Sequence, residues 1–178
     1  MHAEAERIDP DEKRTTISLI SVDPLETCKI GEILGQRLRG GDCVALIGEL
    51  GSGKTCLAQG IARGIGIPDG FTVTSPTFTI INEYPSHPIS LYHMDVYRLQ
   101  GLSDLEEMGL EEYLSGTGVL VIEWAERIIE ALPEEAVYIR ITYVDEFTRR
   151  IEISGQHKRI DSWKEPMHSV SNSERNER

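Results

Sequence analysis

One stretch restricts the fold of this chain more than any other: residues 48–55, which read Gly-Glu-Leu-Gly-Ser-Gly-Lys-Thr. They match the pattern G-x-x-x-x-G-K-[ST] at every fixed position. The residues before them, Cys43–Ile47, are apolar without interruption, which is typical of a strand buried on both faces of a parallel sheet. After them, Leu57, Ile61 and Ile65 recur at helical spacing. The glycines therefore fall at a turn from a strand into a helix, and the pattern predicts a phosphate-binding loop.

Such a loop holds polyphosphate mainly through backbone N–H groups that point into a concavity, and only glycine lets the backbone curl that tightly. We expect the Lys54 ammonium to reach the β- and γ-phosphates and the Thr55 hydroxyl to ligate Mg²⁺. The implied ligand is a nucleoside triphosphate. The alternative, a chance glycine turn, has odds of about one in a hundred in a chain of this length. The expected ligand contacts are all the loop residues: Gly48, Glu49, Leu50, Gly51, Ser52, Gly53, Lys54 and Thr55.

The charge of the chain is strongly negative. Asp and Glu number 30 against 18 Lys and Arg, which gives a formal net charge of −12. This balance opposes a large contact with phosphate backbones, so any role in nucleic acid chemistry should pass through a partner. The sequence has no apolar span of about 20 residues, and residues 1–14 lack an apolar signal segment. We expect a cytoplasmic protein that does not contact a membrane.

The distribution of apolar residues predicts one α/β domain over residues 15–155, with a flexible extension (1–14) and a polar, disordered tail (156–178). The continuous apolar runs at 43–47 and 119–122 should be central parallel strands. Further strands are expected at 16–21, 75–81, 89–96, 137–143 and 151–153, the last four as two antiparallel hairpins, and helices at 24–39, 54–66, 104–114 (broken at Gly109) and 125–132. The predicted fold is P-loop NTPase-like, with three layers and a central, mostly parallel sheet.

Two carboxylates could complete the site, because a phosphate loop alone neither completes the metal site nor positions an attacking water. Glu123 follows the apolar run 119–122, and open α/β sheets bind their ligands at this end of the strands. Asp95 ends a less regular run. With Lys54, both acids are the expected catalytic residues, and both are expected near the magnesium ion. The cleaner run before Glu123 favours that residue as the direct metal ligand, on a strand next to the loop strand.

Other candidates have two interpretations each. Thr77, within Ser-Pro-Thr-Phe-Thr, is either a sensor of the γ-phosphate or part of a turn that leads into a strand. Trp124 is either a residue that covers the core or one that lines the site. His93 is interpreted as packed or hydrogen-bonded rather than as a base. The acidic stretch 104–112 is either a solvated helix face or a surface for a basic partner.

Several blocks of the sequence together resemble one family. They are Gly-Glu-Leu-Gly-Ser-Gly-Lys-Thr (48–55), Ser-Pro-Thr-Phe-Thr (75–79), His-Met-Asp-Val-Tyr-Arg-Leu (93–99), Leu-Glu-Glu-Met-Gly-Leu-Glu-Glu-Tyr (105–113) and Ile-Glu-Trp-Ala-Glu-Arg (122–127). In this order they are similar to the TsaE (YjeE) ATPases of bacterial tRNA threonylcarbamoyladenosine synthesis. The loop alone is generic, whereas its combination with the Asp-x-Tyr-Arg-Leu and Glu-Trp blocks is specific. The resemblance covers roughly residues 15–155.

The resemblance implies a weak, Mg²⁺-dependent ATPase that binds ATP or ADP and is stimulated by two partner proteins, TsaD and TsaB. It implies that the complex modifies adenosine 37 of tRNAs that read ANN codons, so that this chain meets tRNA only indirectly. It also implies that Thr55 and Glu123 hold Mg²⁺, that Asp95 lies close to the metal and the γ-phosphate, that Trp124 lies beside the nucleotide in a switch-like segment, and that Thr27 lies near the base.

The sequence departs from the family in one place, where Ala125 follows Glu-Trp instead of the common proline. Other classes of protein share the loop. A small-molecule kinase usually carries an arginine-rich lid, and none follows the residues around 110. A GTP-driven switch would have D-x-x-G after Asp95 and an N-K-x-D motif, and the sequence has neither. A nucleotide-gated binding module with negligible turnover is the remaining alternative.

Overall fold

The structure, a computed structural model, describes residues 14–99 and 102–167. The strands are β1 (Arg14–Ser21), β2 (Cys43–Ile47), β3 (Ile81–Tyr84), β4 (Leu91–Asp95), β5 (Val119–Glu123), β6 (Val137–Tyr143) and β7 (Arg149–Gln156). The helices are α1 (Pro24–Gly35), α2 (Lys54–Ile65), α3 (Leu102–Glu107), α4 (Leu110–Leu114) and α5 (His157–Asp161), with 3₁₀ turns η2 (Ala125–Arg127) and η3 (Ile129–Ala131). Among the described residues, none of the helices has the length and apolarity needed to cross a membrane.

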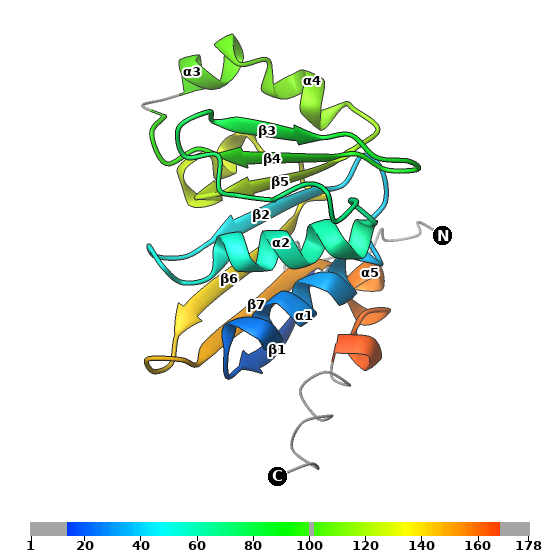
Figure 1. Ribbon diagram of the computed structural model, residues 1–178, viewed down its shortest axis with the longest axis vertical. Helices are drawn as coiled ribbons and strands as arrows, with labels where there is room; N and C mark the ends of the chain where they lie inside the picture. The colour runs from blue at the N-terminus through cyan, green and yellow to red at the C-terminus, as the bar shows by residue number, and fades with distance from the viewer. Residues whose placement is uncertain (1–13, 100–101, 168–178) are drawn as a thin grey trace, which may run out of the picture.

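Within the described residues, seven strands form one sheet in the order β1-β7-β6-β2-β5-β4-β3 (Figure 1). Its centre is parallel, because β2 pairs in parallel with β5 and β6, and β5 pairs in parallel with β4. Every residue of β2 and of β5 is buried, as their continuous apolar runs predicted. The pairs β3–β4, β6–β7 and β1–β7 are antiparallel. The predicted α/β fold with a mostly parallel centre and two hairpins is confirmed.

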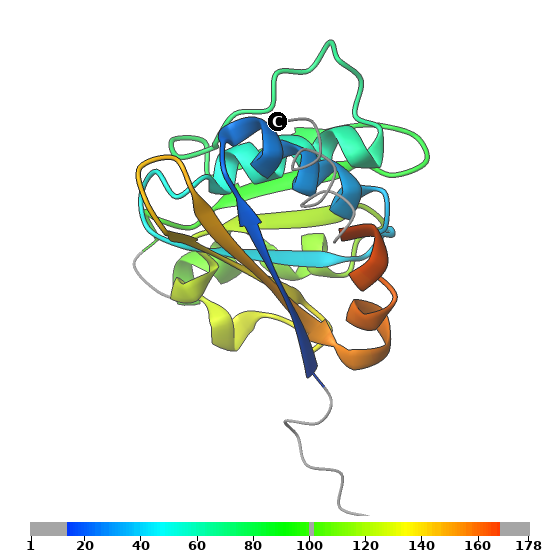
Figure 2. The same cartoon turned by 90° about the horizontal axis from the view of Figure 1, so that it is seen from below.

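The sheet separates two helical layers, which Figure 2 shows edge-on. α1 and α2 lie side by side on one face, and α3, α4 and η2 lie on the other. Side chains of a strand alternate between faces, so the central strands contribute to both cores. Leu46 packs in the core with Ile61 of α2, whereas Ile122 packs in the core with Leu105 of α3. Both faces of the sheet are therefore covered at its centre, which fixes the phosphate loop at the end of a rigid strand.

The helices α1 and α2 approach each other through glycine. A Cβ on Gly31 or Gly60 would lie 2.4 or 2.0 Å from a backbone carbonyl oxygen of the facing helix. Gly35 and Gly64 repeat this contact one turn later, at 2.3 and 2.1 Å. Without these side chains the two backbones can touch, and the start of α1 comes to lie against the start of α2, where the phosphate loop ends.

The expected strand at 75–81 is wrong in most of its length, because only Ile81 begins a strand there. The preceding segment 75–80 is a loop in which Ile80 N–H donates to Pro76 O (2.7 Å) and Ile80 has a φ of +68°. Its hydroxyls bond to the side chain of Asp95 instead of joining a ladder. β-branched residues favoured a strand locally, and the contact with Asp95 overrode this preference. The hairpin itself is present, with Ile81 opposite Met94.

Two further expectations differ from the structure. The helix expected at 125–132 consists of two separate 3₁₀ turns, because Trp124 before them has a left-handed backbone (φ +62°) and the chain becomes irregular at Ile128. The polar tail expected from residue 156 is wrong up to residue 167, because α5 and the following turns bury Ile160, Trp163 and Met167 against the core. Arg14 already belongs to β1. The remainder of the expected extension and tail, 1–13 and 168–178, lies outside the described residues.

We predict that Gly60→Ala lowers the free energy of unfolding by about 2 kcal/mol, because overpacking a close contact costs about 1–3 kcal/mol. Gly70→Ala is the matched control, since a Cβ there has no atom within 4 Å. Its stability should equal or slightly exceed that of the wild type, because alanine restricts the unfolded chain. Urea denaturation measures both. Equal stability of the two variants would show that α1 and α2 can move apart to accommodate the extra methyl group without any loss in the free energy of unfolding.

Candidate nucleotide site

The phosphate loop has the backbone that its glycines predicted. Gly48, Gly51 and Gly53 all have positive φ, at +153°, +76° and +109°. At Gly48 the requirement for glycine is also steric, because a Cβ would lie 2.5 Å from Ile141 O and 2.8 Å from Ser52 Oγ. Gly53, in the left-handed region, precedes the first residue of α2 and directs the loop into the helix. The loop therefore curls around the N-terminal end of a helix twelve residues long.

Residues from the β6–β7 hairpin hold this loop from outside. The Tyr143 hydroxyl donates to Leu50 O (2.7 Å), and Arg149 Nε donates to Ser52 O (3.2 Å). Both donors lie more than 90 positions away along the chain. Sequence reasoning did not find Tyr143 or Arg149, and no local pattern marks them. Ser52 itself is buried, and its Oγ has no hydrogen-bond partner within the described residues.

Lys54 is folded back onto the loop. Its side chain is 4% exposed, and Nζ donates to Gly48 O (2.7 Å) and Glu49 O (2.8 Å). The same ammonium lies 3.7 Å from the centroid of the Trp124 ring, a favourable cation–π geometry. Burial lowers the pKa of Lys54 below its ordinary value, while the nearby carboxylates, Glu123 first among them, oppose this shift. The cation is thus held inside the site next to the ring of Trp124.

Thr55 and Glu123, the two residues expected to hold Mg²⁺, are in direct contact. The Thr55 hydroxyl lies 2.9 and 3.1 Å from the two carboxylate oxygens of Glu123. Glu123 is 3% exposed, and it lies on β5, directly beside the loop strand β2. His93 Nε2 lies 2.9 Å from Glu123 Oε1, and His93 is fully buried. His93 is therefore hydrogen-bonded, as interpreted from the sequence, and it fixes one oxygen of the carboxylate.

Asp95 lies next to Glu123 in the sheet, because the two residues are register partners across β4 and β5. Its Oδ2 accepts hydrogen bonds from Ser75 Oγ and Thr77 Oγ1, both at 2.9 Å. Its Oδ1 accepts from the backbone N–H of Tyr97, also at 2.9 Å. Asp95 is 2% exposed, so these donors compensate the loss of water around it. The sequence had singled out Thr77 but not Ser75 as a functional residue.

Thr27 and Trp124 both lie beside the end of the loop, Thr27 next to Gly53 and Trp124 over Lys54. Thr27 is 2% exposed, and its methyl group would lie 3.7 Å from a Cβ on Gly53. Its hydroxyl bonds to Ser21 Oγ (2.7 Å), so in this structure Thr27 supports the loop from behind. The Trp124 ring covers Lys54 and packs on Tyr97, with ring centroids 4.7 Å apart. The expected proximity of Thr27 to a base stays a prediction.

The residues of this site fit a nucleotide with magnesium. The glycine backbone leaves a concavity that side chains would fill, and Ser52 Oγ is a buried polar atom without a partner in the described chain. Within the described residues, no group of three or more His, Cys, Asp or Glu could hold a metal. Mg²⁺ at phosphate sites usually takes one or two carboxylates, with phosphate oxygens and water as its other ligands. A hydroxyl and a carboxylate such as Thr55 and Glu123 are therefore a sufficient contribution from the protein.

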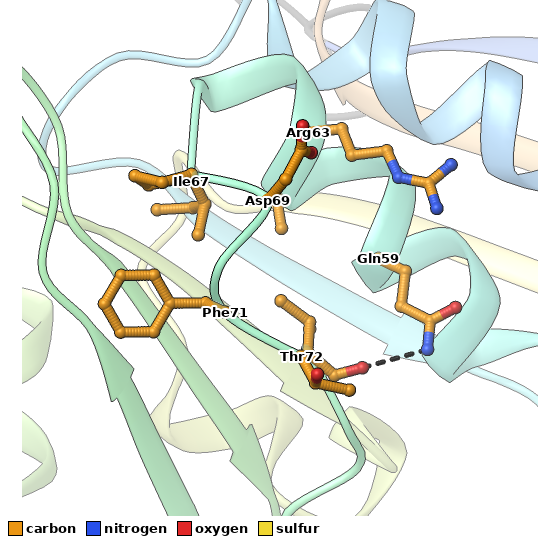
Figure 3. Close-up of a pocket in the computed structure, with 9 residues that line it drawn as sticks. Gln59, Arg63, Ile67, Asp69, Phe71 and Thr72 are labelled. Atoms are coloured by element: carbon orange, nitrogen blue, oxygen red, sulfur yellow. Dashed lines mark hydrogen bonds between the residues drawn. The ribbon is translucent and has the colours of Figure 1, made fainter.

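Another cavity, of about 270 Å³, lies at the opposite end of α2 from the phosphate loop (Figure 3). The Gln59 side chain of α2 points toward the segment at Thr72, and Arg63 and Phe71 also line the cavity. The backbone turns here around Asp69, and Gln59 Nε2 donates to Val73 O (2.9 Å). None of the predicted site residues lines this cavity. This cavity is therefore separate from the candidate site at the carboxyl ends of β2, β5 and β4.

The fold and the loop define a nucleotide-binding protein of the P-loop class. Comparison with known proteins narrows this class. The family model "Threonylcarbamoyl adenosine biosynthesis protein TsaE" matches residues 21–151. The chain belongs to the TsaE family.

Individual relatives agree with this assignment. The chain is 42% identical over 135 residues to the tRNA threonylcarbamoyladenosine biosynthesis protein TsaE of Treponema pallidum, covering 76% of this chain and 98% of the relative. It is 42% identical to the protein of the same name from Bacillus subtilis, covering 79% of this chain and 87% of that one. The crystal structure of YdiB from Bacillus subtilis superposes with a TM-score of 0.73 at 35% identity, covering 89% of this chain and 98% of YdiB.

We predict that His93→Leu lowers the free energy of unfolding by about 1–3 kcal/mol, because Glu123 then loses a donor in a buried position. His93→Gln keeps an N–H donor of similar reach and should retain more of the stability. Urea denaturation at constant pH compares the two variants with the wild type. A leucine variant at least as stable as the glutamine variant would contradict a structural role for this hydrogen bond.

Proposed function

We propose that this protein is the ATP-binding and ATP-hydrolysing component of tRNA threonylcarbamoyladenosine biosynthesis, with weak activity of its own. The observation that carries the proposal is the 2.9 Å contact between Thr55, at the start of α2, and Glu123, at the end of strand β5 beside the loop strand β2. It joins the end of the phosphate loop to a carboxylate at the end of the next strand, which is the arrangement that a P-loop ATPase needs for its metal. The names of the relatives supply the pathway.

Each residue of the site has a role in this proposal. The loop amides and Lys54 bind the phosphates, and Thr55 and Glu123 hold Mg²⁺. Bound Mg²⁺ would neutralise negative charge on the phosphate oxygens. Asp95, oriented by Ser75 and Thr77, would position the attacking water. Lys54 must leave the carbonyls of Gly48 and Glu49 to reach phosphate, which links nucleotide binding to the position of the Trp124 ring.

The proposed partners are proteins of the TsaD and TsaB type. The net charge of −12 supports an indirect relation to tRNA, because the chain offers little positive charge for a phosphate backbone. We place this activity in the cytoplasm, where tRNA is modified. Phosphate-release rates with and without the two partners test the proposal directly. If no phosphate release is measured under either condition, the protein is a nucleotide-gated binding module and not an ATPase.

We predict that Lys54→Ala abolishes measurable nucleotide binding, because the phosphate charge is left uncompensated in a site built around one cation. Titration calorimetry with ATP and ADP in the presence of Mg²⁺ measures the affinity. Lys29→Ala, a substitution of an exposed lysine on α1, is the control and should bind as the wild type does. An unchanged nucleotide affinity in the Lys54 variant would refute the assignment of residues 48–55 as a phosphate-binding loop.

We predict different effects for the two acids. Glu123→Ala should reduce the magnesium dependence of nucleotide binding more than Asp95→Ala does, because Glu123 contacts Thr55 and Asp95 does not. Both variants should slow partner-stimulated hydrolysis at least tenfold, or about 1.4 kcal/mol of transition-state stabilisation. Glu130→Ala, at an exposed position on η3, is the control.

Nucleotide titration across a magnesium series, paired with phosphate-release rates, separates the two roles. Loss of magnesium dependence in the Asp95 variant alone would mean that the roles are exchanged. Wild-type hydrolysis in both variants would mean that the catalytic carboxylates lie elsewhere.

A further inference from the structure

A groove separates the loop 75–80 from α3, outside the nucleotide site. Its volume is about 560 Å³, and its apolar lining comes from Phe78, Ile80, Leu99 and Met108. Phe78 is 87% exposed, which makes it the most exposed of the large apolar side chains in the described chain. A phenylalanine left in water loses the stabilisation that burial of its ring would give. Phe78 is continuous with the apolar lining of the groove, and contiguous exposed apolar surface is typical of a protein interaction site.

The loop that presents Phe78 is strained. Ile80 is β-branched and has a φ of +68°, a conformation that such residues rarely adopt. Ile80 O accepts a hydrogen bond from the backbone N–H of Asp95 (2.9 Å), so the strained residue is tied directly to the site. Strain of this kind persists where the surrounding structure imposes it, and it occurs often in segments that change conformation. The strain at Ile80 therefore favours a change of conformation in this loop, and the hydrogen bond from Asp95 would transmit that change to the site.

The other wall of the groove is acidic. Asp104 and Glu107 line it from α3. The segment 102–114, which forms α3 and α4, contains no lysine or arginine and has three further glutamates, at positions 106, 111 and 112. The positive charge in the lining is Arg98, whose guanidinium lies 5.5 Å from the centroid of the Phe78 ring. The wall of the groove thus complements a positively charged ligand.

We propose that this groove is the docking site for a segment of a partner protein that carries a large apolar side chain flanked by lysine or arginine. The apolar side chain packs between Phe78 and Met108, and the basic residues face Asp104 and Glu107. Complementary charge of this kind gives a partner its orientation and speeds its association. The inference rests on the proposed function, because the partner is one of the two proteins of the complex.

A partner that docks in this groove would affect the nucleotide site, because Phe78 is joined directly to a residue of that site. Phe78 follows Thr77, whose hydroxyl donates to Asp95 Oδ2 (2.9 Å). A partner that draws Phe78 into an interface shifts Thr77 and changes the hydrogen bonds that orient Asp95. The groove that Phe78 lines includes none of the phosphate-loop residues 48–55. Occupation of the groove should therefore affect hydrolysis while nucleotide affinity stays the same.

The test measures binding of the purified TsaD–TsaB pair to the immobilised, ATP-loaded protein by biolayer interferometry. The variants are Phe78→Ala, which removes the apolar anchor, and Glu107→Lys, which reverses the charge of the wall. The controls are Phe147→Ala, at a 64% exposed position on the β6–β7 hairpin, and Glu130→Lys, at an exposed position on η3. Because Phe78 is so exposed, its substitution should leave the thermal unfolding midpoint unchanged.

We expect Phe78→Ala to weaken partner binding at least tenfold. Glu107→Lys should also weaken partner binding, and the affinity of this variant should depend less on salt concentration than that of the wild type. Both controls should stay within twofold of the wild type. ATP affinity and hydrolysis without partners should be unchanged in the Phe78 variant, and the stimulation by partners should be lost at wild-type partner concentrations.

The outcomes separate the two proposals. If the wild type does not bind the pair, the proposed function and the docking site both fail. If the wild type binds and the groove variants bind equally well, only the docking site is overturned. If Phe147→Ala weakens binding as much as Phe78→Ala does, the partner docks at the hairpin and the inference is wrong.

Discussion

The parallel pairing of β2, β5 and β4 is the constraint on which the site depends. It puts Leu46 beside Glu123, and Glu123 beside Asp95, so that the loop and both carboxylates meet at one edge of the sheet. The strands that carry these acids are buried almost completely, which keeps their positions fixed relative to the loop. Buried carboxylates need hydrogen-bond donors, and Thr55, His93, Ser75 and Thr77 supply them. The hydrogen-bond network is thus a consequence of the strand order.

Elements remote from the chemistry determine how rigidly the loop is held. The glycine contacts between α1 and α2 bring Thr27 against Gly53, and the β6–β7 hairpin brings Tyr143 and Arg149 against the loop carbonyls. The loop is therefore enclosed on both sides by the backbone and side chains of neighbouring elements, while its own glycines place no side chain in the concavity. By contrast, the loop 75–80 is strained and exposed at Phe78. Rigid binding of phosphate and a movable contact with Asp95 are properties of two different segments.

Errors in the sequence-based expectations occur where long-range contacts compete with local preference. The residues 75–81 have strand-forming side chains, yet Ser75 and Thr77 bond to Asp95 and the chain turns at Ile80. After Glu123, the left-handed Trp124 prevents a regular helix. The segment after residue 156 reads as polar, because its three buried residues, Ile160, Trp163 and Met167, are spaced too widely to dominate the composition. Each error follows from a contact that a local reading does not contain.

The sequence by itself determined the phosphate loop, the two buried strands β2 and β5 and the helix after Lys54, because each is encoded by neighbouring residues. It also indicated the two acids, since both follow strands whose ends meet ligands in such sheets. Only the tertiary structure decided which side chains complete the site. Thr55 and Glu123 are 68 positions apart, and Ser52 and Arg149 are 97 apart. Contacts across such distances depend on strand order and helix packing, which no local pattern specifies.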